Sequence, residues 1–181
     1  MSDLIHYRFT TVGAVKGRTI HGVAVPYGEV ATVRDGYGQP YQERFAHGAF
    51  TRTLQERSHK IRLLGMHDGR SFPIGRLTTA QETSRGLEVA FAVSDTTAGN
   101  DALALIRDGS VTGLSIGFMP VRSRVVDGVV ERLEVSLREV SLVTEPAYQG
   151  AQVAGIRSKP EAEYVITNAR ARRTFTALFD I

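Results

Sequence analysis

Residues 112–143 read TGLSIGFMPVRSRVVDGVVERLEVSLREVSLV and decide the fold class. Two β-rich segments, Thr112 to Val126 and Val129 to Val143, flank an Asp127-Gly128 pair. Asp-Gly between two runs of alternating apolar residues is the strongest short-range signal for a β-hairpin, because both residues tolerate the positive φ angles of a tight turn. We therefore predict a long antiparallel hairpin here.

The chain upstream of this hairpin predicts more strands and two helices. Thr97 to Asp108 predicts a helix, with a cap at Thr96 or Thr97 and a stop at Gly109. A shorter helix is predicted over 46–56, where Phe50 and Leu54 share one face. Alternating or clustered apolar residues predict strands at His6–Thr11, Thr19–Val25, Ile61–Met66, Pro73–Thr79 and Gly86–Val93.

Many short strands interrupted by few helices predict an α+β fold that is mainly β. A largely antiparallel β-barrel surrounded by helices is the economical arrangement, because closure removes exposed strand edges. We predict one domain over residues 1–156. From residue 157 to 181 the pattern becomes basic and helical, which predicts a tail that docks on the domain or is separable.

Composition excludes several classes of chemistry. The chain has 181 residues and no cysteine, so thiolate nucleophiles, disulfides and sulfur-based zinc sites are excluded. No apolar run is long enough to span a bilayer, and the amino terminus has no signal-peptide pattern, so we expect a cytoplasmic protein without membrane contact. A net charge of +3 with one RARR cluster does not favour binding of nucleic acid.

A GxSxG pattern at 113–117 makes Ser115 a candidate nucleophile. The nucleophile elbow of α/β-hydrolases needs a helix after this serine, but a strand is predicted there. That fold also places its histidine after the serine, whereas all five histidines here precede Ser115: His6, His21, His47, His59 and His67. The base of any Ser-His pair must therefore come from upstream, and His67 is best placed, at the end of a strand and the start of a loop.

A carboxylate that orients the imidazole should complete such a site. Glu139 lies in an otherwise apolar strand, where a buried carboxylate would need a partner such as a histidine. Alternatively, Glu139 points outward and pairs with an arginine. Glu145, Asp68 and Glu134 compete with it for the role of the acid.

Five blocks of this sequence, taken in order, resemble the prohead proteases of tailed bacteriophages over most of residues 8 to 155. The blocks are GVAVPYGE (22–29), ERFAHGAFTRTL (43–54), LLGMHDGRSFPIGRL (63–77), RDGSVTGLSIGFMP (107–120) and LREVSLVTEPAY (137–148).

That family is similar in fold to the herpesvirus assemblins, an antiparallel barrel ringed by helices. The resemblance implies a serine protease with Ser115 as nucleophile, His67 as base and Glu139 as third member. Assemblins use a second histidine in that third role, and this chain has none left to supply. The resemblance also puts the oxyanion hole in the loop from Thr144 to Gly150, and it implies no metal or organic cofactor.

The resemblance further implies substrates and location. These are the scaffolding protein, or a scaffold segment of the major capsid protein, and the protease itself, cut inside proheads in the host cytoplasm. Shedding of the tail after residue 156 by self-cleavage is a hypothesis, and a homodimer is compatible with the assemblin likeness. Two alternatives remain open: an inactive capsid-assembly factor of the same fold, and an esterase or lipase suggested by GxSxG alone.

Overall fold

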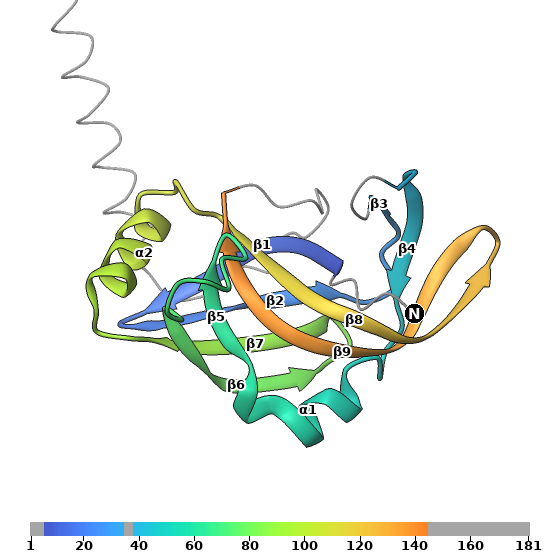
Figure 1. Cartoon of the computed structure of the whole chain (residues 1–181), viewed down its shortest axis with the longest axis horizontal. Coiled ribbons are helices and arrows are strands. Elements are labelled where there is room, and N and C mark those ends of the chain that lie inside the picture. Colours follow the sequence, from blue (N-terminus) through green and yellow to red (C-terminus); the bar gives the residue numbers. More distant parts are fainter. Residues whose placement is uncertain (1–5, 35–37, 145–181) are drawn as a thin grey trace, which may run out of the picture.

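Nine strands, two α-helices and one short 3₁₀ helix make up the part of the chain that the computed structural model describes, residues 6–34 and 38–144 (Figure 1). In chain order they are β1 (His6–Lys16), β2 (Thr19–Pro26), β3 (Ala31–Val33), β4 (Tyr41–Phe45), α1 (Thr51–Arg57), η1 (Ser58–Lys60), β5 (Arg62–Gly65), β6 (Gly75–Glu82), β7 (Gly86–Val93), α2 (Thr97–Arg107), β8 (Gly113–Val126) and β9 (Val129–Val143). The tail predicted over 157–181, and its boundary at 156, lie outside the described residues.

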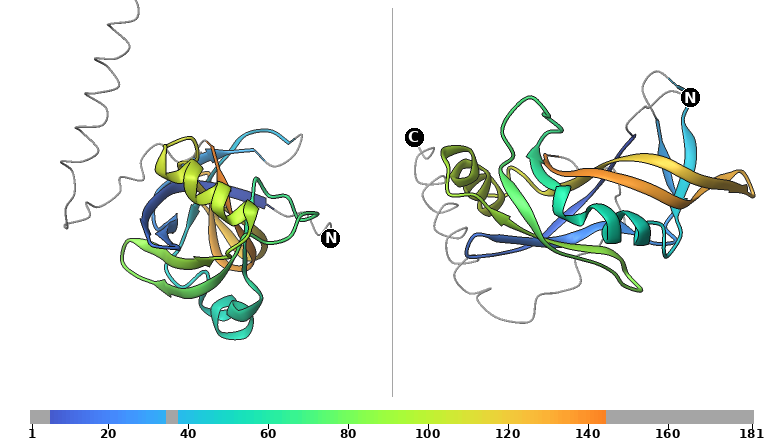
Figure 2. Two further views of the ribbon diagram at one scale, coloured as in Figure 1. Left: turned by 90° about the vertical axis from the view of Figure 1, so that its left-hand side faces the viewer. Right: turned by 60° about the horizontal axis from the view of Figure 1, so that its bottom comes forward.

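The described strands form one sheet that closes on itself. Their order is β3-β4-β9-β5-β6-β7-β2-β1-β8, and β8 also pairs with β9, so seven strands from β9 round to β8 form a ring. Within the described residues the pairings are antiparallel except for β4–β9 and β5–β9. Figure 2 shows the sheet curling around, with α1 and α2 outside it. The predicted mainly β, largely antiparallel barrel with outer helices is confirmed.

The hairpin of β8 and β9 is the longest strand pair, as the sequence predicts. Val126 pairs with Val129 across the turn, and Asp127 and Gly128 have φ angles of 51° and 78°. Positive φ at both central residues is the requirement of a type I′ turn, whose twist matches that of the flanking strands. The far end of the same hairpin, near Gly113 and Val143, lies within the ring.

A β-bulge at Arg138 changes which face of β9 points inward. Gly117 pairs with Glu139 while Phe118 pairs with Leu137, so Arg138 is an extra residue in β9. Leu137 and Val140 therefore both pack in the core, although strict alternation would put them on opposite faces. The consequence is that Glu139 leaves the core face of β9.

The core fills the inside of the curled sheet. Leu114, Ile116 and Phe118 project into it from β8 on alternate residues. All parts of the ring contribute apolar side chains, including Ile20, Val25, Leu63, Leu87, Phe91, Leu137 and Val140, joined by Phe45 and Phe50. The face of the β8–β9 ladder opposite to this core is called the outer face below.

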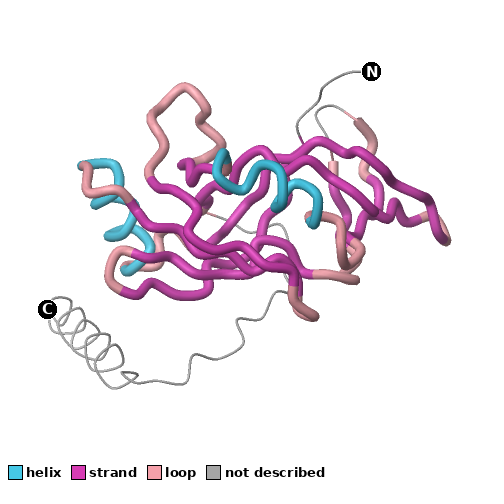
Figure 3. The backbone as a smooth tube through the Cα atoms, turned by 90° about the horizontal axis from the view of Figure 1, so that it is seen from below, coloured by secondary structure: helices cyan, strands magenta, loops and turns pink. Residues whose placement is uncertain are grey.

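The two α-helices lie close to their predicted positions. Thr96 caps α2 by accepting a hydrogen bond from the Gly99 amide at 3.2 Å, and Gly109 beyond its end has φ +83°. The helix predicted over 46–56 forms later, as α1, and only Leu54 of its expected apolar pair lies within it. Figure 3 shows both helices against a body made mainly of strands. None of the described helices is long and apolar enough to cross a bilayer.

The short strands β3 and β4 are absent from the sequence prediction. They extend the sheet beyond the ring, with β4 running parallel to the start of β9. Glu43 of β4 is fully buried between Arg8 of β1 and Arg132 of β9: its carboxylate pairs with Arg8 Nε and lies 2.6 Å from Arg132 Nε. Tyr41 Oη accepts hydrogen bonds from both guanidinium groups at 2.9 and 2.8 Å. This ion cluster holds β4 against the ring.

Candidate active site

Ser115 lies in the middle of the ring section of β8, on the outer face. Its neighbours Leu114 and Ile116 point into the core, so alternation turns Ser115 the other way. Ser141 of β9 lies directly opposite it in the ladder. Directly opposed residues on one face have Cβ atoms about 5 Å apart, so the two serines are neighbours. Both serines are fully buried.

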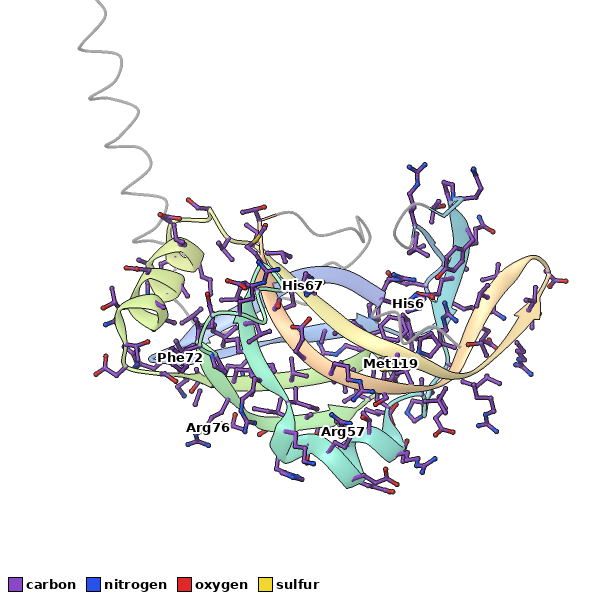
Figure 4. The ribbon with its side chains drawn as sticks, viewed as in Figure 1. His6, Arg57, His67, Phe72, Arg76 and Met119 are labelled. Carbon is purple, nitrogen blue, oxygen red and sulfur yellow. The ribbon has the colours of Figure 1, made fainter. Side chains whose placement is uncertain are left out.

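His67 reaches the same face through a tight turn at the end of β5. The Met66 amide donates to the Leu142 carbonyl at 2.9 Å, and the Asp68 amide donates to the Gly65 carbonyl at 2.9 Å. Met66 and His67 have φ angles of 50° and 58°, a left-handed conformation that costs a non-glycine residue roughly 1–2 kcal/mol. The turn brings the imidazole back across β9, beside the ribbons of β8 and β9 (Figure 4).

Glu139 meets the imidazole of His67 on the outer face. The distance between His67 Nδ1 and Glu139 Oε1 is 2.6 Å. The other carboxylate oxygen, Oε2, accepts a hydrogen bond from Ser141 Oγ at 2.7 Å. The side chains of His67 and Glu139 are 15% and 14% exposed, so water screens their contact little. The expectation that Glu139 has a histidine partner matches this geometry, and the alternative of an arginine partner does not.

Gly117, the last residue of GxSxG, leaves room for that carboxylate. It pairs with Glu139 in the ladder, and a Cβ built on Gly117 would lie 2.4 Å from Glu139 Oε1. Any side chain at residue 117 would therefore force Glu139 away from its present position. The glycine that suggested a hydrolase elbow has a different role in this fold: it lets the acid lie flat over β8.

Ser115 and His67 both lie beside Ser141, yet the hydroxyl of Ser115 makes no hydrogen bond to the imidazole. Ser115 Oγ is buried and has no hydrogen-bond partner among the described residues. Catalytic hydrogen bonds are often long or misaligned without substrate and tighten when it binds. The arrangement thus contains a paired imidazole and acid, with a buried hydroxyl one strand away.

Residues 7–164, most of the chain, match the family of caudovirus prohead serine proteases. The chain belongs to that family. Over 115 residues it is 28% identical to the prohead protease of Enterobacteria phage HK97, a match that covers 61% of this chain. The chain spans about half the length of that curated relative, 51%. The resemblance drawn from the five sequence blocks is confirmed.

The capsid assembly protease of bacteriophage T4 is a similar solved structure. Its TM-score is 0.46 at 12% sequence identity, with 71% of this chain and 98% of that chain covered.

Two of the competing acids in this prohead protease family member, Asp68 and Glu134, have other partners. Asp68 accepts hydrogen bonds from Ser71 Oγ at 2.6 Å and from the Arg70 amide at 2.9 Å, and these bonds lower the pKa of its carboxyl group. Glu134 pairs with Arg52 at 3.3 Å. Glu145 and most of the predicted oxyanion loop, 145–150, lie outside the described residues. Glu139 is therefore the candidate acid whose contact with His67 the structure describes.

Ser141 is the site residue that sequence reasoning missed. Its Oγ accepts a hydrogen bond from the His67 amide at 3.2 Å in addition to donating to Glu139. Two signals in the sequence could have pointed to it. It follows Glu139 by two residues, which puts both side chains on the same face of a strand, and it lies in the strand that pairs with the strand of Ser115.

Proposed function

We propose that this chain is a serine endopeptidase of phage head maturation, with Ser115 as nucleophile, His67 as general base and Glu139 as the acid that orients the imidazole. The observation that carries the proposal is the contact of His67 Nδ1 with Glu139 at 2.6 Å, beside the strand position opposite Ser115. An imidazole held by a carboxylate next to a serine is the arrangement of serine-protease catalysis.

The hydrogen bond fixes the roles of the two imidazole nitrogens. A neutral His67 whose Nδ1–H donates to Glu139 carries its lone pair on Nε2. Nε2 would take the proton of Ser115 Oγ while the oxygen attacks a peptide carbonyl, and would then deliver it to the leaving amine. Glu139 would stabilise the imidazolium that forms in between. Water would hydrolyse the acyl-enzyme on Ser115 by the same path.

Substrate binding has to complete this site. Ser115 Oγ must come within hydrogen-bond distance of Nε2, about 2.6–3.2 Å, and backbone amides must receive the oxyanion. We propose that the loop from Thr144 to Gly150 supplies those amides, as the family resemblance implies. A preorganised oxyanion hole contributes a large share of catalysis in such enzymes.

The substrates follow from the kind of relative that the chain matches. The HK97 relative is a prohead protease, so we propose the scaffolding protein, or a scaffold segment of the major capsid protein, as substrates inside proheads in the host cytoplasm. Self-cleavage after the domain over 1–156 and a homodimeric state are part of the same hypothesis. No cofactor is needed for the steps above.

One observation favours a second candidate, an inactive assembly factor of the same fold. Ser115 is fully buried and lacks a hydrogen bond to His67, as a purely structural serine would. Such a protein would bind capsid or scaffold chains without cutting them. The esterase alternative has no matching elbow, because β8 continues as a strand after Ser115.

Co-expression with the cognate capsid and scaffold proteins separates these functions. Intact masses of all chains would be followed for the wild type, Ser115→Ala, and the matched control Ser136→Ala on β9 opposite Met119. We expect cleavage by the wild type and by Ser136→Ala, and none by Ser115→Ala. Equal processing by all three, or intact chains in normally assembled proheads, would support the assembly factor instead.

A further inference from the structure

Ser141 hydrogen-bonds two of the three proposed catalytic residues and lies opposite the third in the ladder. It faces Ser115 across the β8–β9 ladder, and it pairs with Leu64 on the other side, two residues before the left-handed turn. The side chain is fully buried. A polar group in such a place costs free energy unless its hydrogen bonds are satisfied.

The single hydroxyl of Ser141 joins two of those residues. It donates a hydrogen bond to Glu139 Oε2 at 2.7 Å and accepts one from the His67 amide at 3.2 Å. A serine hydroxyl has one proton to donate, so the bond to Glu139 uses its whole donor capacity. Because Oε1 of Glu139 contacts His67 Nδ1, both carboxylate oxygens are held, and the carboxylate cannot rotate about its last bond.

The turn that carries His67 needs such a restraint. Met66 and His67 both have left-handed backbone angles, which persist only where surrounding contacts impose them. The amide of His67 is tied to Ser141 Oγ, and the amide of Met66 to the Leu142 carbonyl. Two adjacent residues of β9 thus hold the backbone on which the imidazole stands.

We propose that Ser141 is a positioning residue for the reaction: it holds the backbone of His67 and the carboxylate of Glu139 in fixed positions relative to each other. This inference rests on the proposed protease function. It predicts that Ser141 affects the chemical step and not the binding of substrate, because its buried hydroxyl contacts only His67 and Glu139 among the proposed catalytic residues.

Kinetics with two substitutions separates this role from packing. Ser141→Ala removes the hydroxyl, and Ser141→Cys keeps the volume but donates a hydrogen bond weakly. We expect both to lower kcat by about 10- to 100-fold with KM changed less than about twofold, the effect of losing a hydrogen bond to a charged group. Ser136→Ala is the matched control and should keep the wild-type kcat.

Either of two kinetic results would overturn the inference. The first is a wild-type kcat in Ser141→Ala. The second is a wild-type kcat in Ser141→Cys with a loss in Ser141→Ala, which would indicate packing. If the wild type itself cleaves nothing, the proposed function fails, and the following measurement still tests Ser141.

Proton NMR in a Ser115→Ala background reports on the pair directly, without catalysis. The Nδ1 proton of His67, held by Glu139, should resonate far downfield and exchange slowly with water. Removing the Ser141 hydroxyl should move this resonance upfield and speed its exchange. An unchanged resonance and exchange rate would mean that Ser141 does not position the pair.

Discussion

Glu139 and Glu43 are two glutamates that the same barrel takes out of water, and they differ in the partner it gives them. Glu139 lies on the outer face of β9 and contacts an imidazole and a hydroxyl. Glu43 lies on β4, fully buried between two guanidinium groups. Both carboxylates are therefore paired, as burial requires.

The chemistry of the partner separates a reactive pair from a structural one. A guanidinium keeps its charge at any physiological pH, so Glu43 with Arg8 and Arg132 forms a permanent ion cluster that joins three strands. An imidazole can gain or lose a proton near neutral pH, so a carboxylate beside it can stabilise a charge that appears during a reaction. The following substitutions test that contrast, in order of decreasing expected effect.

Glu139→Gln should lower kcat by about 10³- to 10⁴-fold, equivalent to about 4–5.5 kcal/mol of activation free energy. The amide keeps the shape but cannot stabilise an imidazolium. Because the amide has the same shape and can still hydrogen-bond His67 and Ser141, the free energy of unfolding should change by only about 1 kcal/mol. Single-turnover peptide cleavage and urea unfolding measure the two quantities. Activity within tenfold of the wild type would show that another carboxylate is the acid.

Glu43→Gln should have the opposite effect to Glu139→Gln, lowering the stability of the fold and leaving kcat unchanged. It leaves Arg8 and Arg132 without their buried anion, which should lower the free energy of unfolding by about 3–5 kcal/mol. The folded fraction should keep its kcat. Urea unfolding is the measurement, and Glu56→Gln, which removes an exposed ion pair with Arg52, is the control, with an expected change much smaller than that of Glu43→Gln. Equal losses in both variants would contradict the structural role of the cluster.

Glu82 is held mainly by neutral hydrogen-bond donors, with His47 as an electrostatic neighbour, and it sharpens the comparison. It accepts hydrogen bonds from Tyr27 Oη at 2.5 Å, from the Phe50 amide at 3.1 Å and from Thr51 Oγ1. Burial acts to raise the pKa of Glu82, but these hydrogen bonds and the interaction with His47 outweigh it and lower the pKa. Its stabilising effect should be full above the unfolded-state pKa, about 4.3, and lost as pH falls through the lower folded-state pKa.

Glu82→Gln should therefore have the smallest effect, and one that depends on pH. The loss in the free energy of unfolding should be about 1 kcal/mol or less at pH 7, because the carboxylate is partly solvated, and it should shrink toward zero near pH 3. Thermal unfolding of the variant and the wild type at both pH values measures it. A difference that grows at low pH would mean that the pKa of Glu82 is raised in the folded protein.

Local signals in the sequence were sufficient for much of the fold. The Asp127-Gly128 turn, the Thr96 cap and the stop at Gly109 each depend on neighbouring residues alone, so they could be predicted. The strand β4 could not, because Tyr41–Phe45 has little apolar alternation and is held by ions from distant strands. Long-range pairing of charges leaves no local pattern.

The sequence by itself determined the kind of residues at the site: a serine in GxSxG, a histidine that must lie upstream, and a glutamate in an apolar strand. Only the tertiary structure decided how they meet. Counting outward from the turn would place Val140 opposite Ser115, whereas the bulge at Arg138 puts Ser141 there and turns Glu139 onto the outer face. The apolar residues Leu137 and Val140 break the alternation of β9, but a bulge is set by packing on both sides of the sheet, so this pattern alone does not say which residue is the extra one.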